Sequence, residues 1–232
     1  MPRRLSILFS FYFFATVGPG LHRDIFPDII KSPVHGFLPG PGDEKTAKKI
    51  FGVSGAVRMD NIILIGMPGS GKSTVGVVLA KALGLGFVDV DLLIQAREGA
   101  LLQELIDRYG VERFLDLERD AILSLRCGGT VVAPGGSCVC REESIAHMRE
   151  LGTVVCLSLP LEEVEGRVHN LSSRGIALSP GQTLADVYRY RAPLYERCAH
   201  ITVPVGGRSL AETVEDVKNA LAAWEKQANR NR

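Results

Sequence analysis

From residue 62 onward, short apolar runs alternate with segments in which apolar residues recur at helical spacing. The first run, Ile-Ile-Leu-Ile at 62–65, leads into a glycine-rich loop, after which apolar residues recur at positions 75, 78, 79 and 82. A continuous apolar run is typical of a strand buried on both faces, and the later spacing is typical of an amphipathic helix. The pattern thus predicts a strand, a loop and a helix in direct succession.

The same alternation continues to the end of the chain. Four further β-rich runs lie at residues 86–91, 130–136, 153–160 and 200–205. Helical patterns lie at 101–109 and 111–125, and a last one begins with the capping box Ser209-x-x-Glu212 and has apolar residues at 210, 214, 217, 221 and 224. Strands that alternate with helices predict an α/β fold with a parallel sheet covered on both faces.

The first 58 residues do not follow this pattern. Arg3 and Arg4 precede an apolar run at 5–17, and a stretch rich in Pro and Gly follows at 26–43. The run is short for a membrane span and resembles the start of a signal peptide. We interpret residues 1–58 as a leader: an over-extended start, a cleaved signal-like segment or an anchor. Residues 59–232, which begin at a Met directly before the first strand, form one globular domain.

Charge and cysteine content narrow the classes of partner. The 232 residues include 27 basic and 26 acidic side chains, a formal net charge of +1. This balance gives no electrostatic footprint for nucleic acid or for an anionic membrane, so we expect a small-molecule partner. We also expect a monomeric domain and, from its cysteines, a cytoplasmic one. The five cysteines form an odd set without zinc-type spacing and are expected to be reduced thiols. Cys138 and Cys140 fit alternation beside a strand, with a metal or redox role as the alternative.

The glycine-rich loop reads Gly66-x-x-x-x-Gly71-Lys72-Ser73. In such a loop backbone N–H groups converge on phosphate oxygens at a helix N-terminus, the Lys adds a cation for the terminal phosphates, and the Ser offers a hydroxyl to Mg²⁺. An accidental glycine-rich turn is the alternative, but the flanking strand and helix favour phosphate binding. The loop residues expected to bind nucleotide are Gly66, Gly69, Ser70, Gly71, Lys72, Ser73 and Thr74.

Two aspartates end the run at 86–91. Asp89 and Asp91 are two positions apart, so on an extended chain they point to the same side. One could support Mg²⁺ through water while the other takes a proton from an alcohol during phosphoryl transfer; the alternative is two acids at an exposed strand end. The chain has neither the N-K-x-D element of a GTPase nor an apolar strand ending in Asp-Glu, as motor ATPases have. The predicted acceptor is therefore a hydroxyl.

Five segments in this order resemble the shikimate kinase family: GMPGSGKST at 66–74, FVDVD at 87–91, APGGS at 133–137, RVHNLSSRG at 167–175 and RAPLYERCA at 191–199. The resemblance covers most of residues 60–225. It implies the P-loop nucleoside-monophosphate-kinase-like three-layer fold, with a five-stranded parallel sheet and a mobile lid around Arg174. It also implies transfer of the γ-phosphoryl group of ATP to a ring hydroxyl of shikimate, in aromatic amino acid biosynthesis.

The resemblance also implies roles for individual residues. Lys72 would hold the β- and γ-phosphates, and Ser73 and Asp89 would support Mg²⁺. Asp91 would meet the acceptor hydroxyl, and Arg191 would pair with the carboxylate of the substrate. The remaining implied roles are adenine contact for Arg167, closure over the phosphates for the catalytic Arg174, and close approach of substrate to the backbone for Gly135 and Gly136. Without the shared spacing, Arg167 and Arg174 would be interpreted as a solvated helix end and loop, and Arg191 as part of a surface ion pair.

The chain departs from the family where the motif G-E-x-x-F-R-x-x-E is expected. Residues 110–118 read GVERFLDLE, so Leu115 stands at the arginine that grips the substrate carboxylate in the family. Arg119 or Arg113 could supply a shifted arginine, and Ser137 stands at the third glycine of the family pattern. Two alternatives therefore stay open: a kinase for another hydroxylated metabolite, such as a sugar acid, and a non-catalytic ATP-binding module.

Overall fold

The computed structural model describes residues 61–168, 175–179 and 181–230. The proposed boundary between leader and domain at residues 58 and 59, and the predicted lid residue Arg174, lie outside the described residues. None of the helices in the described part is both long and apolar enough to cross a membrane.

Five parallel strands form one sheet in the order β2-β3-β1-β4-β5. Their bounds are β1 Asn61–Ile65, β2 Gly86–Asp89, β3 Thr130–Ala133, β4 Gly152–Ser158 and β5 Ile201–Pro204. The central strand β1 pairs with β3 on one side and β4 on the other, and each of its residues is buried. Burial from both faces explains why its sequence is apolar without alternation. The predicted five-stranded parallel sheet is confirmed.

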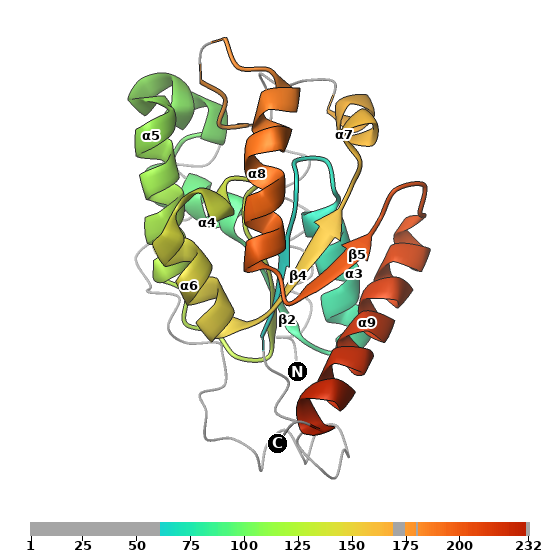
Figure 1. The fold of residues 1–232 in the computed structure, drawn as a ribbon. Coiled ribbons are helices and arrows are strands. Elements are labelled where there is room, and N and C mark those ends of the chain that lie inside the picture. Colours follow the sequence, from blue (N-terminus) through green and yellow to red (C-terminus); the bar gives the residue numbers. More distant parts are fainter. Residues whose placement is uncertain (1–60, 169–174, 180, 231–232) are drawn as a thin grey trace, which may run out of the picture. The chain divides into compact units, whose positions relative to one another are not determined.

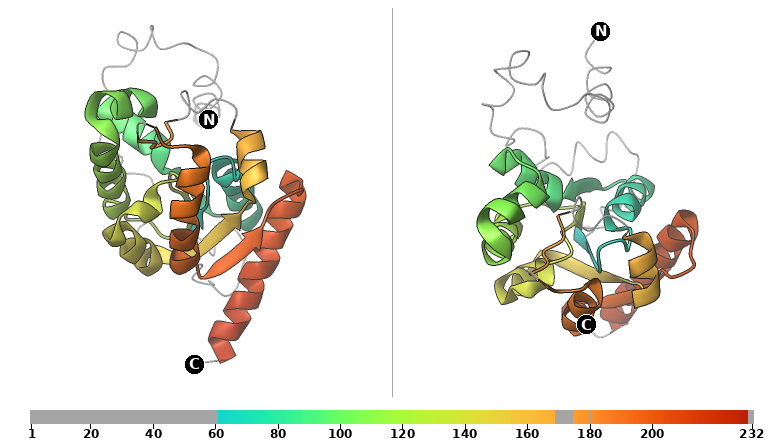
Figure 2. Two further views of the ribbon diagram at one scale, coloured as in Figure 1. Left: turned by 45° about the horizontal axis from the view of Figure 1, so that its top comes forward. Right: turned by 90° about the horizontal axis from the view of Figure 1, so that it is seen from above.

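Seven α-helices lie in the described part of the chain. They are α3 Lys72–Leu83, α4 Val90–Glu98, α5 Leu102–Leu123, α6 Glu142–Leu151, α7 Leu161–Arg167, α8 Leu184–Cys198 and α9 Leu210–Arg230, with a 3₁₀ turn η1 at Cys138–Cys140. Helices α3 and α9 pack together on one face of the sheet, and α6 and α8 contact β4 from the other face (Figures 1 and 2). This arrangement is the three-layer α/β fold that the sequence predicts.

Helix α5 contains a sharp change of direction at Gly110. The φ and ψ angles of Gly110 are 77° and 168°, a combination that favours glycine, and the backbone is helical on both sides of it. The two helices predicted at 101–109 and 111–125 are therefore correct in type, and they meet at this residue. The bend determines which side chains of the second half of α5 face the rest of the domain.

The buried faces of two helices differ from the prediction. In α3 the buried residues are Val75, Gly76, Leu79 and Ala80, while Val78 and Ala82 are exposed. In α9 the capping box is confirmed, because the Ser209 amide donates to Glu212 over 2.8 Å and the Glu212 amide donates to the Ser209 hydroxyl over 3.3 Å. The apolar Leu210, at its first position, and Trp224 are exposed, and Trp224 stacks on His200.

The first strand depends on one polar side chain. The Asn61 amide group donates to the carbonyls of Cys127 and Leu151, each over 2.9 Å, and its oxygen accepts from the Thr130 amide over 3.1 Å. Asn61 is 5% exposed, so these bonds satisfy a buried group that joins β1 to its neighbours.

We propose that residues 1–58 are dispensable for the fold. A chain that starts at Met59 should keep the melting temperature and nucleotide affinity of the full chain, because Asn61 and all of β1 remain. A chain that starts at Gly66 is the control; it lacks the central strand and should not fold. A clear loss of stability in the chain from Met59 would contradict the proposal.

Candidate active site

A cavity of about 420 Å³ opens at the carboxyl ends of the strands. Its walls come from the phosphate loop, the first turn of α4, the second half of α5, the loop between β3 and η1, the segment before α8 and α8 itself. Such an edge is where open α/β sheets bind ligands. Of the predicted site residues, those that line the cavity are Gly69, Gly71, Lys72, Ser73, Thr74, Asp91, Gly135, Gly136, Arg167 and Arg191.

The phosphate loop follows β1 and ends in the first turn of α3. Gly71 is the N-cap of α3 with φ 89°, so a left-handed residue brings the backbone into the helix where phosphate would bind. The Lys72 ammonium donates to the carbonyls of Gly66 and Met67 over 2.9 and 3.1 Å, and burial lowers its pKa. Gly66 and Ser70 belong to the loop but do not line the cavity, and Arg174 lies outside the described residues.

Asp91 lies in the first turn of α4 and not on a strand. The prediction that Asp89 and Asp91 share one side of an extended chain is wrong: β2 ends at Asp89, and the Asp89 side chain caps α4 by accepting from the amides of Asp91 and Leu92 over 3.0 and 3.4 Å. Capping competes with strand extension here because Asp is a favoured N-cap residue. Of the two aspartates, Asp91 lines the cavity and Asp89 does not.

The Asp91 carboxyl group has a perturbed pKa. Burial and, to a smaller extent, the Asp89 charge raise the pKa, the nearby Lys72 ammonium acts in the opposite direction, and the net result is a pKa of about 6. With a pKa near 6, the carboxylate is still the main form at pH 7 and can accept a proton. A carboxylate with this tuning beside a phosphate loop suits proton abstraction from an alcohol.

Glu118 is a cavity residue that the sequence analysis did not select. It lies on α5, is 2% exposed and lines the cavity with Asp91 and Arg191. Burial and the charge of Asp91 together raise its pKa to about 7, against the opposing effect of Arg191 and Lys72. The sequence feature that could have identified Glu118 is its place in the family motif, three residues after Leu115.

Glycine is required where the β3–η1 loop passes these carboxyl groups. A Cβ atom on Gly135 would collide with the carboxyl oxygens of both Glu118 and Asp91, and one on Gly136 would lie 3.0 Å from the ring of Pro68. Tyr195 on α8 donates its hydroxyl hydrogen to the Gly136 carbonyl and so fixes the loop from the other side. A side chain at 135 or 136 would therefore fill space beside the two carboxyl groups and Pro68, and glycine leaves the backbone accessible there.

Arg191 carries the positive charge on the α8 side of the cavity. The residue is 4% exposed, and its Nη2 donates to the Ala177 carbonyl over 2.9 Å. Within the described residues no carboxylate forms an ion pair with it. A buried guanidinium is costly without an anionic partner, so this end of the cavity favours an anion. The alternative interpretation of Arg191 as a surface ion pair is wrong.

Arg167 lies at the C-terminal end of α7 at the mouth of the cavity. Its guanidinium forms an ion pair with Glu163 one turn earlier over 2.8 Å and reaches the Gly69 carbonyl over 3.5 Å. The side chain is 37% exposed, so the ion pair adds little to stability. Its position against the phosphate loop is compatible with the predicted contact to the base of a nucleotide.

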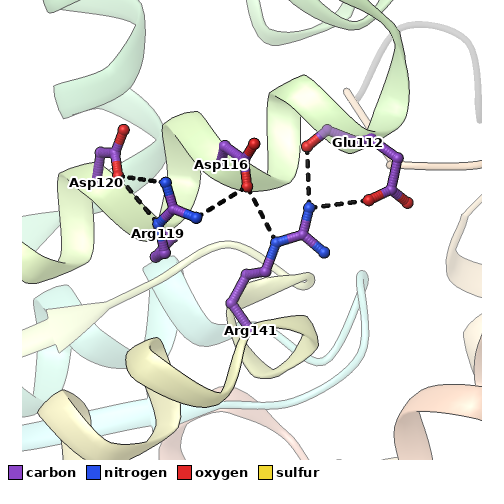
Figure 3. A network of polar contacts seen from close by, with 5 residues as sticks. All are labelled: Glu112, Asp116, Arg119, Asp120 and Arg141. Atoms are coloured by element: carbon purple, nitrogen blue, oxygen red, sulfur yellow. Dashed lines mark hydrogen bonds and ion pairs between the residues drawn. The ribbon is translucent and has the colours of Figure 1, made fainter.

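Neither candidate for a shifted arginine reaches the cavity. Arg119 forms ion pairs with Asp116 and Asp120 over 3.0 and 2.9 Å, and Arg141 joins the same group through Asp116 and Glu112 (Figure 3). This network holds α5 to the segment that begins α6, and none of its five residues lines the cavity.

Arg113, the other candidate for a shifted arginine, and Leu115, the residue it would replace, lie on different sides of α5. Arg113 is exposed, and Leu115 is 7% exposed inside the core. Neither lines the cavity, although Phe114 and Glu118 on either side of Leu115 do. The described part of the site therefore has Arg191 as its buried arginine and no second one from α5.

A cavity that joins a phosphate loop to a buried carboxylate and a buried arginine on this sheet defines a P-loop kinase that acts on a small molecule. The family model described as shikimate kinase matches residues 68–222, well over half of the chain. The chain therefore belongs to the shikimate kinase family. It is a phosphotransferase with an alcohol acceptor, and ATP is its co-substrate.

Curated relatives and solved structures agree with this assignment. The shikimate kinases of Paracidovorax citrulli and Nitratidesulfovibrio vulgaris are each 39% identical over 167 residues, which is 69% of this chain and 91% and 95% of theirs. The structure of Acinetobacter baumannii shikimate kinase in complex with shikimate covers 71% of this chain and 94% of its own, at 27% identity and a TM-score of 0.67. That of the Aquifex aeolicus enzyme covers 70% and 96%, at 30% identity and a TM-score of 0.61.

Proposed function

We propose that this protein transfers the γ-phosphoryl group of ATP to a ring hydroxyl of shikimate, giving shikimate 3-phosphate, with the residues of the cavity in the roles described below. The observation that carries the proposal is the buried Arg191, which faces the same cavity as the phosphate loop and Asp91. An acceptor with both a hydroxyl and a carboxylate can meet Asp91 with the first and Arg191 with the second.

The phosphoryl group would be held from the α3 side. Backbone amides of the loop and the Lys72 ammonium would contact the phosphates, and Lys72 would give up its bonds to Gly66 and Met67 to do so. Arg167 at the mouth would lie beside the base, and Arg174 would close over the phosphates. The charge that spreads over the phosphoryl oxygens in a loose transition state is stabilised by such cations.

Asp91 would accept the proton of the attacking hydroxyl. It faces the loop from α4, and the Cβ-free backbone at Gly135 leaves room for the acceptor against it. Gly136 lies next to it, so the acceptor ring would pass along the backbone between Asp91 and Arg191. The proton moves to a carboxylate whose pKa, about 6, makes it a stronger base than an unperturbed aspartate.

Magnesium fits the oxygen donors near the loop. The Ser73 hydroxyl lines the cavity, and Asp89 uses Oδ1 for capping while its second carboxylate oxygen takes no part in those bonds. We propose that Ser73 and, through water, Asp89 hold the ion, in keeping with the preference of Mg²⁺ for oxygen ligands and retained waters. When bound, the ion supplies positive charge to the phosphates.

The direct test is ADP release by the full chain with shikimate and with a panel of polyols, sugar acids and amino alcohols. We expect shikimate to be consumed in proportion to ADP formed, with identification of the phosphorylated product by NMR. Reactions without acceptor measure the background hydrolysis of ATP. Rapid turnover of another alcohol with none of shikimate would overturn the proposal.

A second candidate function rests on Leu115. An apolar side chain stands where the family motif has an arginine that binds the substrate carboxylate. The second candidate function is therefore phosphorylation of a less anionic hydroxylated metabolite. A non-catalytic ATP-binding module is disfavoured, since such a module has no use for Asp91 buried opposite Lys72. The same acceptor panel separates the three functions.

A further inference from the structure

Glu118 is a buried acid on α5, and the arginine that precedes it by three residues in the family motif is replaced by Leu115 in this chain. Glu118 is 2% exposed on α5, it lines the cavity, and its Oε2 atom is buried without a hydrogen-bond partner among the residues that the structure describes. Position 115, one turn earlier on the same helix, carries Leu in place of the arginine of the family motif. An unpartnered carboxyl oxygen in a ligand cavity is costly unless a ligand pairs with it, so it marks a contact for the substrate.

The groups around Glu118 come from several elements. Asp91 on α4 adds negative charge, whereas Lys72 on α3, Arg191 on α8 and the Ser137 hydroxyl before η1 favour the ionised form. The other titratable groups that face Glu118 are Cys138, Cys140 and Tyr195. Burial raises the pKa of each of them, so all three are neutral near pH 7. Burial and Asp91 outweigh the cations, and the pKa of Glu118 rises to about 7.

We infer that Glu118 in its protonated form donates a hydrogen bond from Oε2 to the carboxylate of the acceptor, and so supplies the donor that Leu115 cannot. An ionised Glu118 would repel that carboxylate, whereas the carboxylic acid offers it one O–H donor. Together with Arg191 the acid would complete the anion-binding end of the cavity. This inference rests on the proposed function, because it requires an acceptor with a carboxylate.

The consequence is a coupling between substrate binding and protonation. The free Glu118 is protonated below about pH 7 and ionised above it. Because the complex requires the acid form, binding takes up a proton at higher pH. The dissociation constant for shikimate should be nearly constant below about pH 6.5 and rise by about tenfold per pH unit above about pH 7.5.

The test is calorimetric titration of the full chain with shikimate, without nucleotide or metal, between pH 6 and 8.5. At pH 8 two buffers of different ionisation enthalpy give the number of protons taken up, which should approach one. Glu118→Gln has an amide donor at every pH, so it should bind as the parent does at pH 6, with a flat profile and no proton uptake. Glu118→Ala is the matched control without a donor and should bind about 10- to 100-fold more weakly than the parent at pH 6.

Nucleotide affinity and melting temperature show whether each variant is folded. The inference is overturned if the parent binds shikimate with a pH-independent constant and no proton uptake. It is also overturned if folded Glu118→Gln keeps the slope of the parent or binds as weakly as Glu118→Ala. The parent measurements alone decide the matter if the variants do not fold. Absence of any shikimate phosphorylation by the parent would instead count against the proposed function itself.

Discussion

Asp91→Asn should lower kcat with shikimate by about 10²- to 10⁴-fold and leave nucleotide affinity nearly unchanged. The amide keeps the shape of the side chain in the first turn of α4 but cannot accept the proton of the attacking hydroxyl. Asp89, whose side chain accepts the capping hydrogen bonds at the start of α4, is not altered. Rapid-quench measurement of the first turnover, with ATP binding measured separately, distinguishes a loss of chemistry from a loss of binding.

Lys72→Ala is the contrasting variant for this experiment. It removes the ammonium that bonds to the Gly66 and Met67 carbonyls, and it should weaken nucleotide binding as well as turnover. A protein in which Asp91→Asn retained full turnover would show that another group takes the proton. If both variants lost only nucleotide affinity, Asp91 would act on the metal–nucleotide complex and not on the acceptor.

The sequence predicted the sheet and the phosphate loop well because their signals are local. An apolar run with no alternation indicates a central parallel strand, and the glycine, Lys and Ser positions of the loop are fixed by their spacing. The strand ends were harder to predict. Asp89 ends β2 because its side chain caps α4, and the propensity pattern for residues 86–91 does not distinguish capping from two more residues of strand.

The acceptor side of the site could be predicted only in part. Arg191 and the two glycines followed from the family resemblance, but the burial of Arg191 depends on how α8 packs against the η1 segment. Glu118 was missed because its side chain enters the cavity only through the position of α5 after the bend at Gly110. Arg119 matched the expected spacing, yet its nearest partners are acids on the outer side of the same helix.

Leu115→Arg is the second variant with a large expected effect, a decrease of about 10- to 100-fold in KM for shikimate at pH 8. The new guanidinium would lie one turn before Glu118, beside the cavity residues Phe114 and Glu118. It adds a donor for the substrate carboxylate, worth about 1.5–3 kcal/mol for a hydrogen bond to a charged group. Its charge would also lower the pKa of Glu118 from about 7 and remove the need for proton uptake.

The pH dependence makes this prediction specific. At pH 6 the parent already has a protonated Glu118 as donor, so the gain from Leu115→Arg should be smaller there than at pH 8. Leu115→Met is the matched control, because it keeps an apolar side chain of similar volume in the core and should change KM little at either pH. Leu115 is 7% exposed, so melting temperatures must accompany the kinetics. A folded Leu115→Arg enzyme with the KM of the parent at pH 8 would mean that the carboxylate of the acceptor does not lie beside α5.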